Sequence, residues 1–282
     1  GRPLDEAFAA FEDEPVASAS IGQVHRAVLP DGRPVAVKVQ HPGIDEAMRN
    51  DLQNSALVEQ TFRLFAGSKF ESKRIADEIR QRFSEELDYA LEARRQSEIR
   101  AVHLDDPRIH VPEVIGSHSA AKVLTSEWAA GMSFAEAVTQ PEELRRGWAE
   151  TMWRFAYKSI QIGGQFNADP HPGNYKFHGD GRVTFLDHGC VQETDGKKRD
   201  AGIATHYAAC VGDVAGFEDG ARTMLNLRGG VFEDAALEYL HEAFAPQLRS
   251  PYRIERDYVA GLAKRFKDIF QVARTCTDES YV

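Results

Sequence analysis

Apolar and polar residues alternate in two stretches near the start of the chain, and this period of two predicts β-strands. The strands are expected at residues 23–29 and 35–40. Pro30-Asp31-Gly32 lies between them, and these turn-forming residues predict a hairpin connection. Two further short strands are expected at residues 109–115 and 122–128.

A helical pattern follows the hairpin. Pro42-Gly43 ends the second strand, Asp45 can cap a helix, and apolar residues then recur as far as Gly67. A longer helix is predicted from a stripe of apolar residues at every fourth position: Ile75, Ile79, Phe83, Leu87 and Leu91. From Pro141 onward the chain is expected to be mainly helical.

One β-like pair interrupts the helical second half, at residues 175–177 and 183–186, joined by a Gly-Asp-Gly turn. Strands with inserted helices, followed by a helical half, predict an α+β fold of two unequal lobes. We place the β-rich lobe at residues 1–128 and the helical lobe at residues 129–282, with Ala129-Ala130-Gly131 at the join.

Composition narrows the classes of protein. The 282 residues are 42% hydrophobic and 28% charged, which allows a buried core. No apolar run is long enough for a membrane span, and no signal peptide opens the sequence. A net charge of -10 argues against a nucleic-acid partner. Cys190, Cys210 and Cys276 fit neither a disulfide framework nor a zinc site, so a cytoplasmic location is expected.

An alanine-rich segment precedes the first long strand. A nucleotide-binding loop of the form GxGxxGxV reads AxAxxGxV here, and its candidate residues are Ala17, Ser18, Ala19, Ser20, Gly22 and Val24. Glycine in such loops lets backbone N–H groups approach phosphate closely, whereas alanine stiffens the loop. The alternative interpretation is a tight turn before a strand.

Lys38 stands in the second strand, among valines. Alternation places Val35, Val37 and Val39 on one face, and Ala36 and Lys38 on the other. In the kinase pattern the small alanine leaves room for adenine and the lysine reaches the α- and β-phosphates. The alternative is a lysine that protects an edge strand from pairing.

Acidic residues cluster where the long helix is expected to continue. Glu86, Asp88 and Glu92 lie within seven residues, and Asp88 and Glu92, four apart, would share a helix face. A kinase-type lysine needs a carboxylate to fix its position, and Glu92 is our candidate. A solvated acidic face is the alternative.

The strongest chemical pattern lies in the second half of the chain. Asp169 is followed by Asn174, and after the short β pair comes Asp187-His188-Gly189. In kinases the first aspartate orients the attacking hydroxyl, while the asparagine and second aspartate bind Mg²⁺. His171 and His188 suggest a transition-metal site as the alternative, but the hard oxygen donors around them favour Mg²⁺.

Together these segments resemble the UbiB/ADCK (AarF-type) atypical kinases. The resemblance is carried by ASASIGQVHRA, VAVKVQHPG, EELDYALEARR, FNADPHPGN and LDHG, between residues 17 and 189. It implies that Lys38 pairs with Glu92 and that Glu86 and Asp88 form the ExD motif of the family. It also implies that Asn174 and Asp187 bind metal and that Asp169 is the catalytic-loop aspartate.

Two family features are missing from the sequence. We find no N-terminal KxGQ motif and no hydrophobic C-terminal helices, so we expect an N-terminally truncated chain or a shorter variant. The family's frequent Asp-Phe-Gly is replaced by Asp187-His188-Gly189. Glu127, at the end of an expected strand, completes the predicted nucleotide-binding residues.

The function expected from this resemblance is that of an ATP- and Mg²⁺-dependent atypical kinase or ATPase. It would support isoprenoid-quinone biosynthesis or lipid homeostasis, with membrane lipid or quinone-pathway proteins as partners. The location would be the cytoplasm or the inner face of a membrane.

One alternative is a nucleotide-binding pseudokinase that acts in assembly. The other is a small-molecule phosphotransferase, against which the alanine-rich loop and the ExD motif argue. No Ala-Pro-Glu segment follows Asp187, so protein substrates are not expected.

Overall fold

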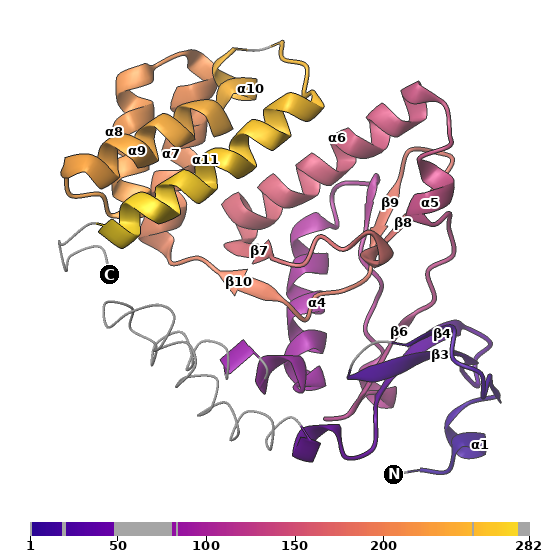
Figure 1. Cartoon of the computed structure of the whole chain (residues 1–282). Coiled ribbons are helices and arrows are strands. Elements are labelled where there is room, and N and C mark those ends of the chain that lie inside the picture. Colours follow the sequence, from indigo (N-terminus) through magenta and orange to yellow (C-terminus); the bar gives the residue numbers. More distant parts are fainter. Residues whose placement is uncertain (1, 19–20, 48–80, 83, 250, 276–282) are drawn as a thin grey trace. The chain divides into compact units, whose positions relative to one another are not determined.

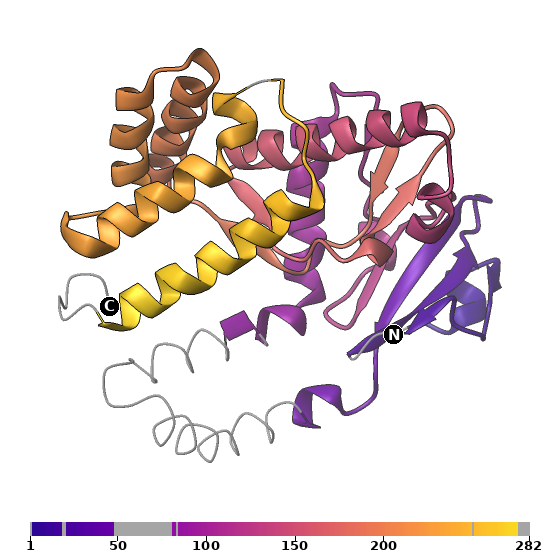
Figure 2. The same cartoon turned by 45° about the horizontal axis from the view of Figure 1, so that its top comes forward.

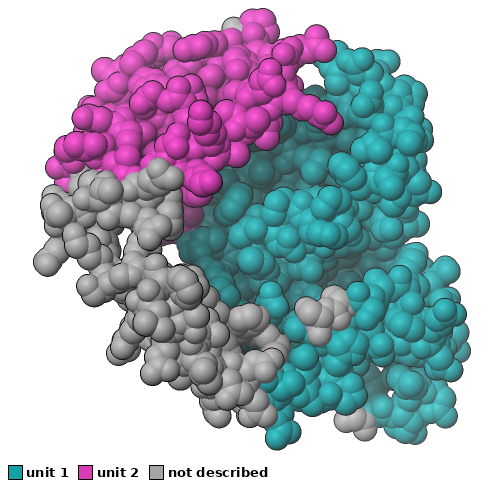
Figure 3. Space-filling model, in the orientation of Figure 1, with its two compact units in different colours: residues 1–65, 72–193 teal, residues 66–71, 194–282 magenta. Residues whose placement is uncertain are grey.

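The computed structural model of the chain describes residues 2–18, 21–47, 81–82, 84–249 and 251–275. The chain divides into two compact units, which Figure 3 colours separately. Unit 1 comprises residues 1–65 and 72–193, and unit 2 comprises residues 66–71 and 194–282. The first expected helix beyond residue 47, and the longer helix up to residue 80, lie outside the described residues.

Unit 1 opens with a short helix and a set of antiparallel strands (Figure 1). The elements are α1 (Leu4–Ala7), β1 (Ala10–Phe11), β2 (Ala17–Ser18), β3 (Gly22–Val28), β4 (Pro34–Gln40) and β6 (Val123–Glu127). Within the described residues these strands form a five-stranded sheet in the order β1-β3-β4-β6, with β2 paired to β3. The hairpin predicted between β3 and β4 is confirmed, and Gly32 in its turn has a φ of 88°.

One face of this sheet packs into a hydrophobic core, as the alternation of residues predicts. Val35 and Val37 are buried against Leu29 and Ile115 in a cluster that also includes Phe8 of the N-terminal segment. The opposite face carries Lys38, which pairs in register with Val24 of β3. The hydrophobic face therefore anchors the strand, and Lys38 points away from that core.

The helix α4 (Tyr89–His103) lies beside the sheet and contacts both β6 and α6 (Figures 1 and 2). The continuous helix expected through residue 91 is wrong at one point, because the helical segment before it ends near Glu86. Asp88 is the N-cap of α4, and its carboxylate accepts the Leu91 N–H at 2.9 Å. Aspartate competes for helix-start N–H groups, and this capping separates the two helices.

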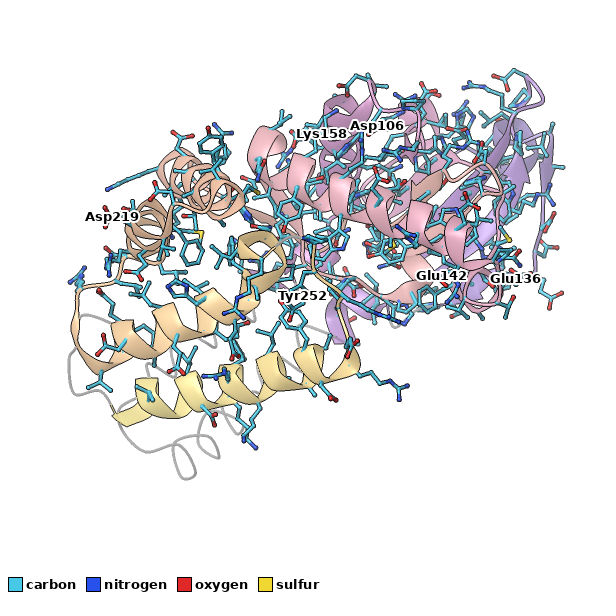
Figure 4. All side chains as sticks on the ribbon, turned by 90° about the horizontal axis from the view of Figure 1, so that it is seen from above. Asp106, Glu136, Glu142, Lys158, Asp219 and Tyr252 are labelled. Atoms are coloured by element: carbon cyan, nitrogen blue, oxygen red, sulfur yellow. The ribbon has the colours of Figure 1, made fainter. Side chains whose placement is uncertain are left out.

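The rest of unit 1 combines small sheets with helices around a second core. The elements are β5 (Ile109–His110), α5 (Phe134–Ala137), α6 (Glu142–Lys158), a π-helical turn (Ser159–Gly163), β7 (Gln165–Asn167), β8 (Tyr175–Phe177), β9 (Val183–Phe185) and β10 (Val191–Glu193). β8 and β9 form the predicted antiparallel pair, β5 joins β9 in parallel, and β7 pairs with β10. Ion pairs Arg154–Asp106 and Lys158–Asp105 connect α6 to the turn after α4. Figure 4 labels Asp106 of that turn and Lys158 of α6.

The regular secondary structure of unit 2 is entirely helical within its described residues. Its helices are α7 (Gly196–Val211), α8 (Val214–Leu225), α9 (Gly230–Ala243), α10 (Ala245–Leu248) and α11 (Arg256–Thr275). Phe217 and Ala221 of α8 are fully buried, with Ala208 and Leu240 in the same cluster. α7 and α8 approach closely at Gly220, where an added Cβ would overlap Thr205 Oγ1. This unit has a hydrophobic core of its own.

The predicted α+β class is confirmed by this combination of a small antiparallel sheet and a mainly helical second half. The boundary predicted between residues 128 and 129 falls inside unit 1, and as a boundary between lobes it stays a prediction. Among the described residues, no helix is both long enough and apolar enough to cross a lipid bilayer.

Candidate active site

Lys38 and Glu92 form the ion pair predicted from the sequence. The Lys38 Nζ donates to Glu92 Oε1 at 2.8 Å and to Oε2 at 2.9 Å, across 54 positions of sequence. Glu92 is only 4% exposed, and Lys38 is partly buried. Burial by itself would lower the pKa of Lys38, but the charges of Glu92 and Asp187 outweigh it and raise the pKa. The lysine is therefore a fixed positive charge.

Asp187 lies on the other side of the same lysine. Its Oδ2 is 3.7 Å from Lys38 Nζ, and its Oδ1 accepts the N–H of Gly189 at 2.9 Å. The two oxygens of this carboxylate thus face different neighbours, which fixes the rotation of the group. The Asp-x-Gly motif predicts this arrangement, in which a carboxylate oxygen lies next to a lysine of the kind that contacts phosphate in kinases.

Asn167 connects the segment of Asp169 to that of Asp187. Its side-chain Nδ2 donates to the carbonyl oxygen of Asp187 at 2.8 Å, while its Oδ1 accepts the N–H of Asp169 at 3.0 Å. The N–H of Ala168 also donates to the carbonyl of Cys190 at 2.8 Å. The amide side chain of Asn167 and the backbone bond from Ala168 therefore join two loops that lie 20 residues apart in sequence.

Asn174 completes this loop. Its Nδ2 donates to the carbonyl and to Oδ2 of Asp169, both at 3.2 Å, and its own carbonyl accepts the N–H of Leu186 at 2.9 Å. Asp169 is exposed to solvent, as expected for a group that must meet a substrate. The structure thus brings Asp169, Asn174 and Asp187 into one connected set of loops.

This geometry agrees with the comparison to known proteins. Residues 1–219 match the ABC1 atypical kinase-like domain. The chain belongs to this family. The matched part includes Lys38, Glu92, Asp169, Asn174 and Asp187, so the family match covers every element of the site described above.

Relatives and a solved structure extend the comparison. An uncharacterized protein of Synechocystis sp., slr0889, is 34% identical over 70% of this chain and 52% of its own length. The atypical kinase coq-8, a mitochondrial protein of Caenorhabditis elegans, is 33% identical over 83% of this chain and 32% of its own length. The Mycobacterium tuberculosis protein Rv3197, solved with erythromycin, has 31% identity and a TM-score of 0.75 over 93% of this chain and 67% of that one. The predicted kinase-like fold and family are confirmed, and the chain spans about half or less of these two curated relatives.

The alanine-rich loop is described only in part. Ala17 and Ser18 form β2, paired with Val24 and Gln23 of β3, and both are exposed. Ala19 and Ser20 lie outside the described residues. Val24 is half-buried and pairs in register with Lys38. The contact of this loop with phosphate stays a prediction.

Gly22 at the start of β3 sits against Tyr89, the first residue of α4. A Cβ on Gly22 would stand 2.5 Å from the carbonyl oxygen of Val39 and 2.7 Å from the hydroxyl of Tyr89. Lys38 Nζ lies 5.0 Å from the centre of the Tyr89 ring, a cation–π distance. The Tyr89 hydroxyl is buried and has no hydrogen-bond partner among the described residues. The lack of a side chain at Gly22 thus allows β3 to lie close to the Val39 carbonyl oxygen and to the Tyr89 hydroxyl.

Replacing Gly22 by alanine should lower the free energy of unfolding by about 1–3 kcal/mol, because the obstructing Val39 oxygen belongs to the backbone and cannot move aside cheaply. Gly147→Ala is the matched control, since a Cβ added at this position of helix α6 would meet nothing within 4 Å. That change should raise stability by up to about 1 kcal/mol, through helix propensity. Urea denaturation of both variants tests this pair, and equal stability of Gly22→Ala and wild type would contradict the steric argument.

The ExD residues serve different purposes in the structure. Asp88 caps α4, as described above. Burial, and after it the charges of Asp187 and Asp169, raise the pKa of the Glu86 carboxyl. The functional role of the ExD glutamate stays a prediction.

Ala36 and Glu127 lie on the paired strands β4 and β6. Ala36 pairs in register with Arg26 on one side and Ser126 on the other. The Glu127 carboxylate lies 3.2 Å from His110 Nε2 and accepts the N–H of Glu113 at 3.4 Å. The side chain of Glu127 is thus engaged within the protein, and a contact with nucleotide stays a prediction.

The two histidines of the motifs have structural contacts. His171 Nδ1 accepts the N–H of Gly173 at 3.1 Å and so shapes the loop before Asn174. His188 is fully buried, and burial lowers its pKa to about 4, so the ring is neutral near pH 7. Its Nε2 lies 3.3 Å from the carbonyl oxygen of Phe185.

Across the described part of the chain, no group of three or more His, Cys, Asp or Glu side chains could hold a metal ion. Mg²⁺ is commonly held by one or two carboxylates, with waters and substrate phosphates as the other ligands. The donor set of Asn174 and Asp187 fits that mode of binding, in which nucleotide phosphate supplies further oxygens.

Sequence reasoning missed three residues of this site: Asn167, Tyr89 and Arg95, whose Nη1 donates to the carbonyl oxygen of Gly189. All three stand inside the quoted motifs, but nothing in their spacing indicates which remote backbone group each one contacts. The partner of Asn167, for example, is the carbonyl of Asp187, 20 residues away. The one local signal was the polar residue Asn167, two positions before Asp169.

Proposed function

We propose that this chain binds ATP with Mg²⁺ and transfers or hydrolyses the terminal phosphate, as an atypical kinase or ATPase. The observation that carries the proposal is the placement of Lys38 between Glu92 and Asp187, at 2.8 Å and 3.7 Å. A lysine fixed by a buried glutamate, next to a second carboxylate, suits a nucleotide phosphate and its metal ion. Membership in the atypical kinase-like family supports the same conclusion.

Each residue then has a chemical task. Lys38 would bind the α- and β-phosphates, and Asn174 and Asp187 would hold Mg²⁺. Bound Mg²⁺ would neutralise part of the negative charge of the phosphates. Asp169 would accept the hydrogen bond of the attacking hydroxyl or water and so orient it. Its contact with Asn174 Nδ2 keeps the carboxylate beside the metal-binding side chain.

We further propose an acceptor in isoprenoid-quinone or lipid metabolism, reached at a membrane face. The support is the family resemblance and the absence of an Ala-Pro-Glu segment after Asp187, the segment that docks peptides in protein kinases. The relatives include a mitochondrial atypical kinase, coq-8, and chloroplastic proteins named for activity of bc1 complex kinase. Proteins of the quinone pathway are the partners that this proposal implies.

The test begins with nucleotide binding by the purified chain. A fluorescent ATP analogue should bind with Mg²⁺ and bind at least about tenfold more weakly in EDTA. Phosphate release is then measured with and without phospholipid vesicles and phenolic quinone-precursor mimics, and we expect these additions to increase turnover. Nucleotide binding without turnover under every condition would contradict enzymatic activity and favour the pseudokinase alternative. No Mg²⁺-dependent binding at all would contradict the proposal.

A further inference from the structure

Arg95 is a buried arginine whose charge has no place in the mechanism above. It stands three residues after Glu92 on α4, so the two side chains leave the same face of the helix. Its side chain is 6% exposed. A guanidinium so deeply buried is costly unless its donors are satisfied, and its partners therefore matter.

Those partners lie on two separate segments. Arg95 Nη1 donates to the carbonyl oxygen of Gly189 at 3.0 Å, and Nη2 donates to Glu85 Oε2 at 2.9 Å. Glu85 itself accepts a hydrogen bond from Gln81 at 2.9 Å and lies 3.4 Å from Arg82 Nη1. Burial alone would raise the pKa of Glu85, but these donors outweigh it and lower the pKa. The glutamate is thus an ionised anchor for Arg95.

The contact with Gly189 leads directly to Asp187. Gly189 gives its carbonyl to Arg95 and its N–H to Asp187 Oδ1 at 2.9 Å. One residue therefore stands between the buried guanidinium and the carboxylate proposed to bind metal. A Cβ on Gly189 would lie only 3.3 Å from the same Oδ1, so the glycine packs closely against that group.

We propose that Arg95, anchored by Glu85, is a positioning residue that holds Gly189 and thereby sets the orientation of the Asp187 carboxylate for a small divalent cation. The inference rests on the proposed function. Arg95 acts through Gly189 and touches neither substrate nor metal. Mg²⁺ demands near-ideal octahedral geometry, whereas Ca²⁺ accepts irregular arrangements of oxygen. A displaced Asp187 should therefore weaken Mg²⁺ binding more than Ca²⁺ binding.

The experiment compares wild type, Arg95→Met and Arg94→Met. Arg94 is the matched control, since it is the neighbouring arginine on α4, is 63% exposed and lies 3.8 Å from Glu98. For each protein, binding of a fluorescent ATP analogue is titrated with Mg²⁺, with Ca²⁺ and in EDTA, beside the melting temperature. Arg95→Met should raise the half-saturating Mg²⁺ concentration about tenfold, as loss of a group that orients a metal ligand does. The value for Ca²⁺ should change less than about threefold, and binding in EDTA should not change.

The outcomes separate three cases. Unchanged Mg²⁺ titration in Arg95→Met, with normal binding by wild type, overturns the positioning role alone. Equal losses with Mg²⁺, with Ca²⁺ and in EDTA, with a lower melting temperature, mean that Arg95 only stabilises the fold and also overturn it. Absence of Mg²⁺-dependent binding in wild type overturns the proposed function itself.

A second variant covers a failure of Arg95→Met to fold. Arg95→Lys keeps the charge and most of the stem, but offers one nitrogen in place of the two that contact Gly189 and Glu85. It should show the same loss of preference for Mg²⁺ over Ca²⁺ in smaller measure. An unchanged preference in a folded Arg95→Lys protein would overturn the inference.

Discussion

Replacing Asp169 by asparagine is expected to lower turnover of ATP by about 10²- to 10⁴-fold, the usual contribution of a positioned acid–base group. Nucleotide affinity should stay within about twofold, because Asp169 orients the attacking group and is not needed to hold ATP. Asparagine preserves the acceptor for Asn174 Nδ2 and the side chain is exposed, so the fold should survive. Phosphate release and nucleotide binding are measured on the same preparation.

Asp180→Asn is the control for this change. Asp180 occupies the turn between β8 and β9, is 64% exposed and contacts Arg182. It carries the same charge as Asp169 and lies in an exposed turn, so its replacement should leave turnover unchanged. Turnover of Asp169→Asn near the wild-type rate would show that the base lies elsewhere or that Asp169 is only structural.

Replacing Asp187 by asparagine should weaken Mg²⁺-dependent ATP binding by about 100-fold. The change removes one full negative charge from a proposed ligand, an interaction worth a few kcal/mol at these separations. Asparagine can still accept the N–H of Gly189, so the loop should keep its conformation. Binding in EDTA should be unchanged or tighter, because Asp187 also faces Lys38 at 3.7 Å and its charge repels phosphate.

This difference between the responses with and without metal distinguishes a lost ligand from a damaged site. Titrations of a fluorescent ATP analogue with Mg²⁺ and in EDTA measure it, again with Asp180→Asn as the control. Equal Mg²⁺-ATP affinity in Asp187→Asn and wild type would remove Asp187 from the metal site.

Much of the local structure followed from short-range patterns. The alternation around Lys38 predicted a strand whose valines face a core, and Val35 and Val37 are buried there. Pro30-Asp31-Gly32 predicted the hairpin turn, and Gly32 adopts the positive φ that favours glycine. These patterns work because strand pleat and turn geometry involve only a few neighbouring residues.

The helix that carries Glu92 was predicted less well. Leu87 and Leu91 continue a helical stripe, yet the chain leaves the helix between them and Asp88 caps a new one. The same four-residue spacing occurs on both sides of such a break, so periodicity cannot locate it. A capping aspartate competes with the helix interior, and the outcome depends on how each helix packs.

The sequence by itself determined the set of candidate site residues in this protein: a strand lysine, a later helical glutamate, and an Asp–Asn–Asp series in kinase order. The tertiary structure decided which atoms meet. It brings Lys38 to Glu92 across 54 residues, and Arg95 to the carbonyl of Gly189 across 94. Such contacts depend on how the sheet, α4 and the loops pack, because backbone carbonyls look alike in any sequence and only packing selects one.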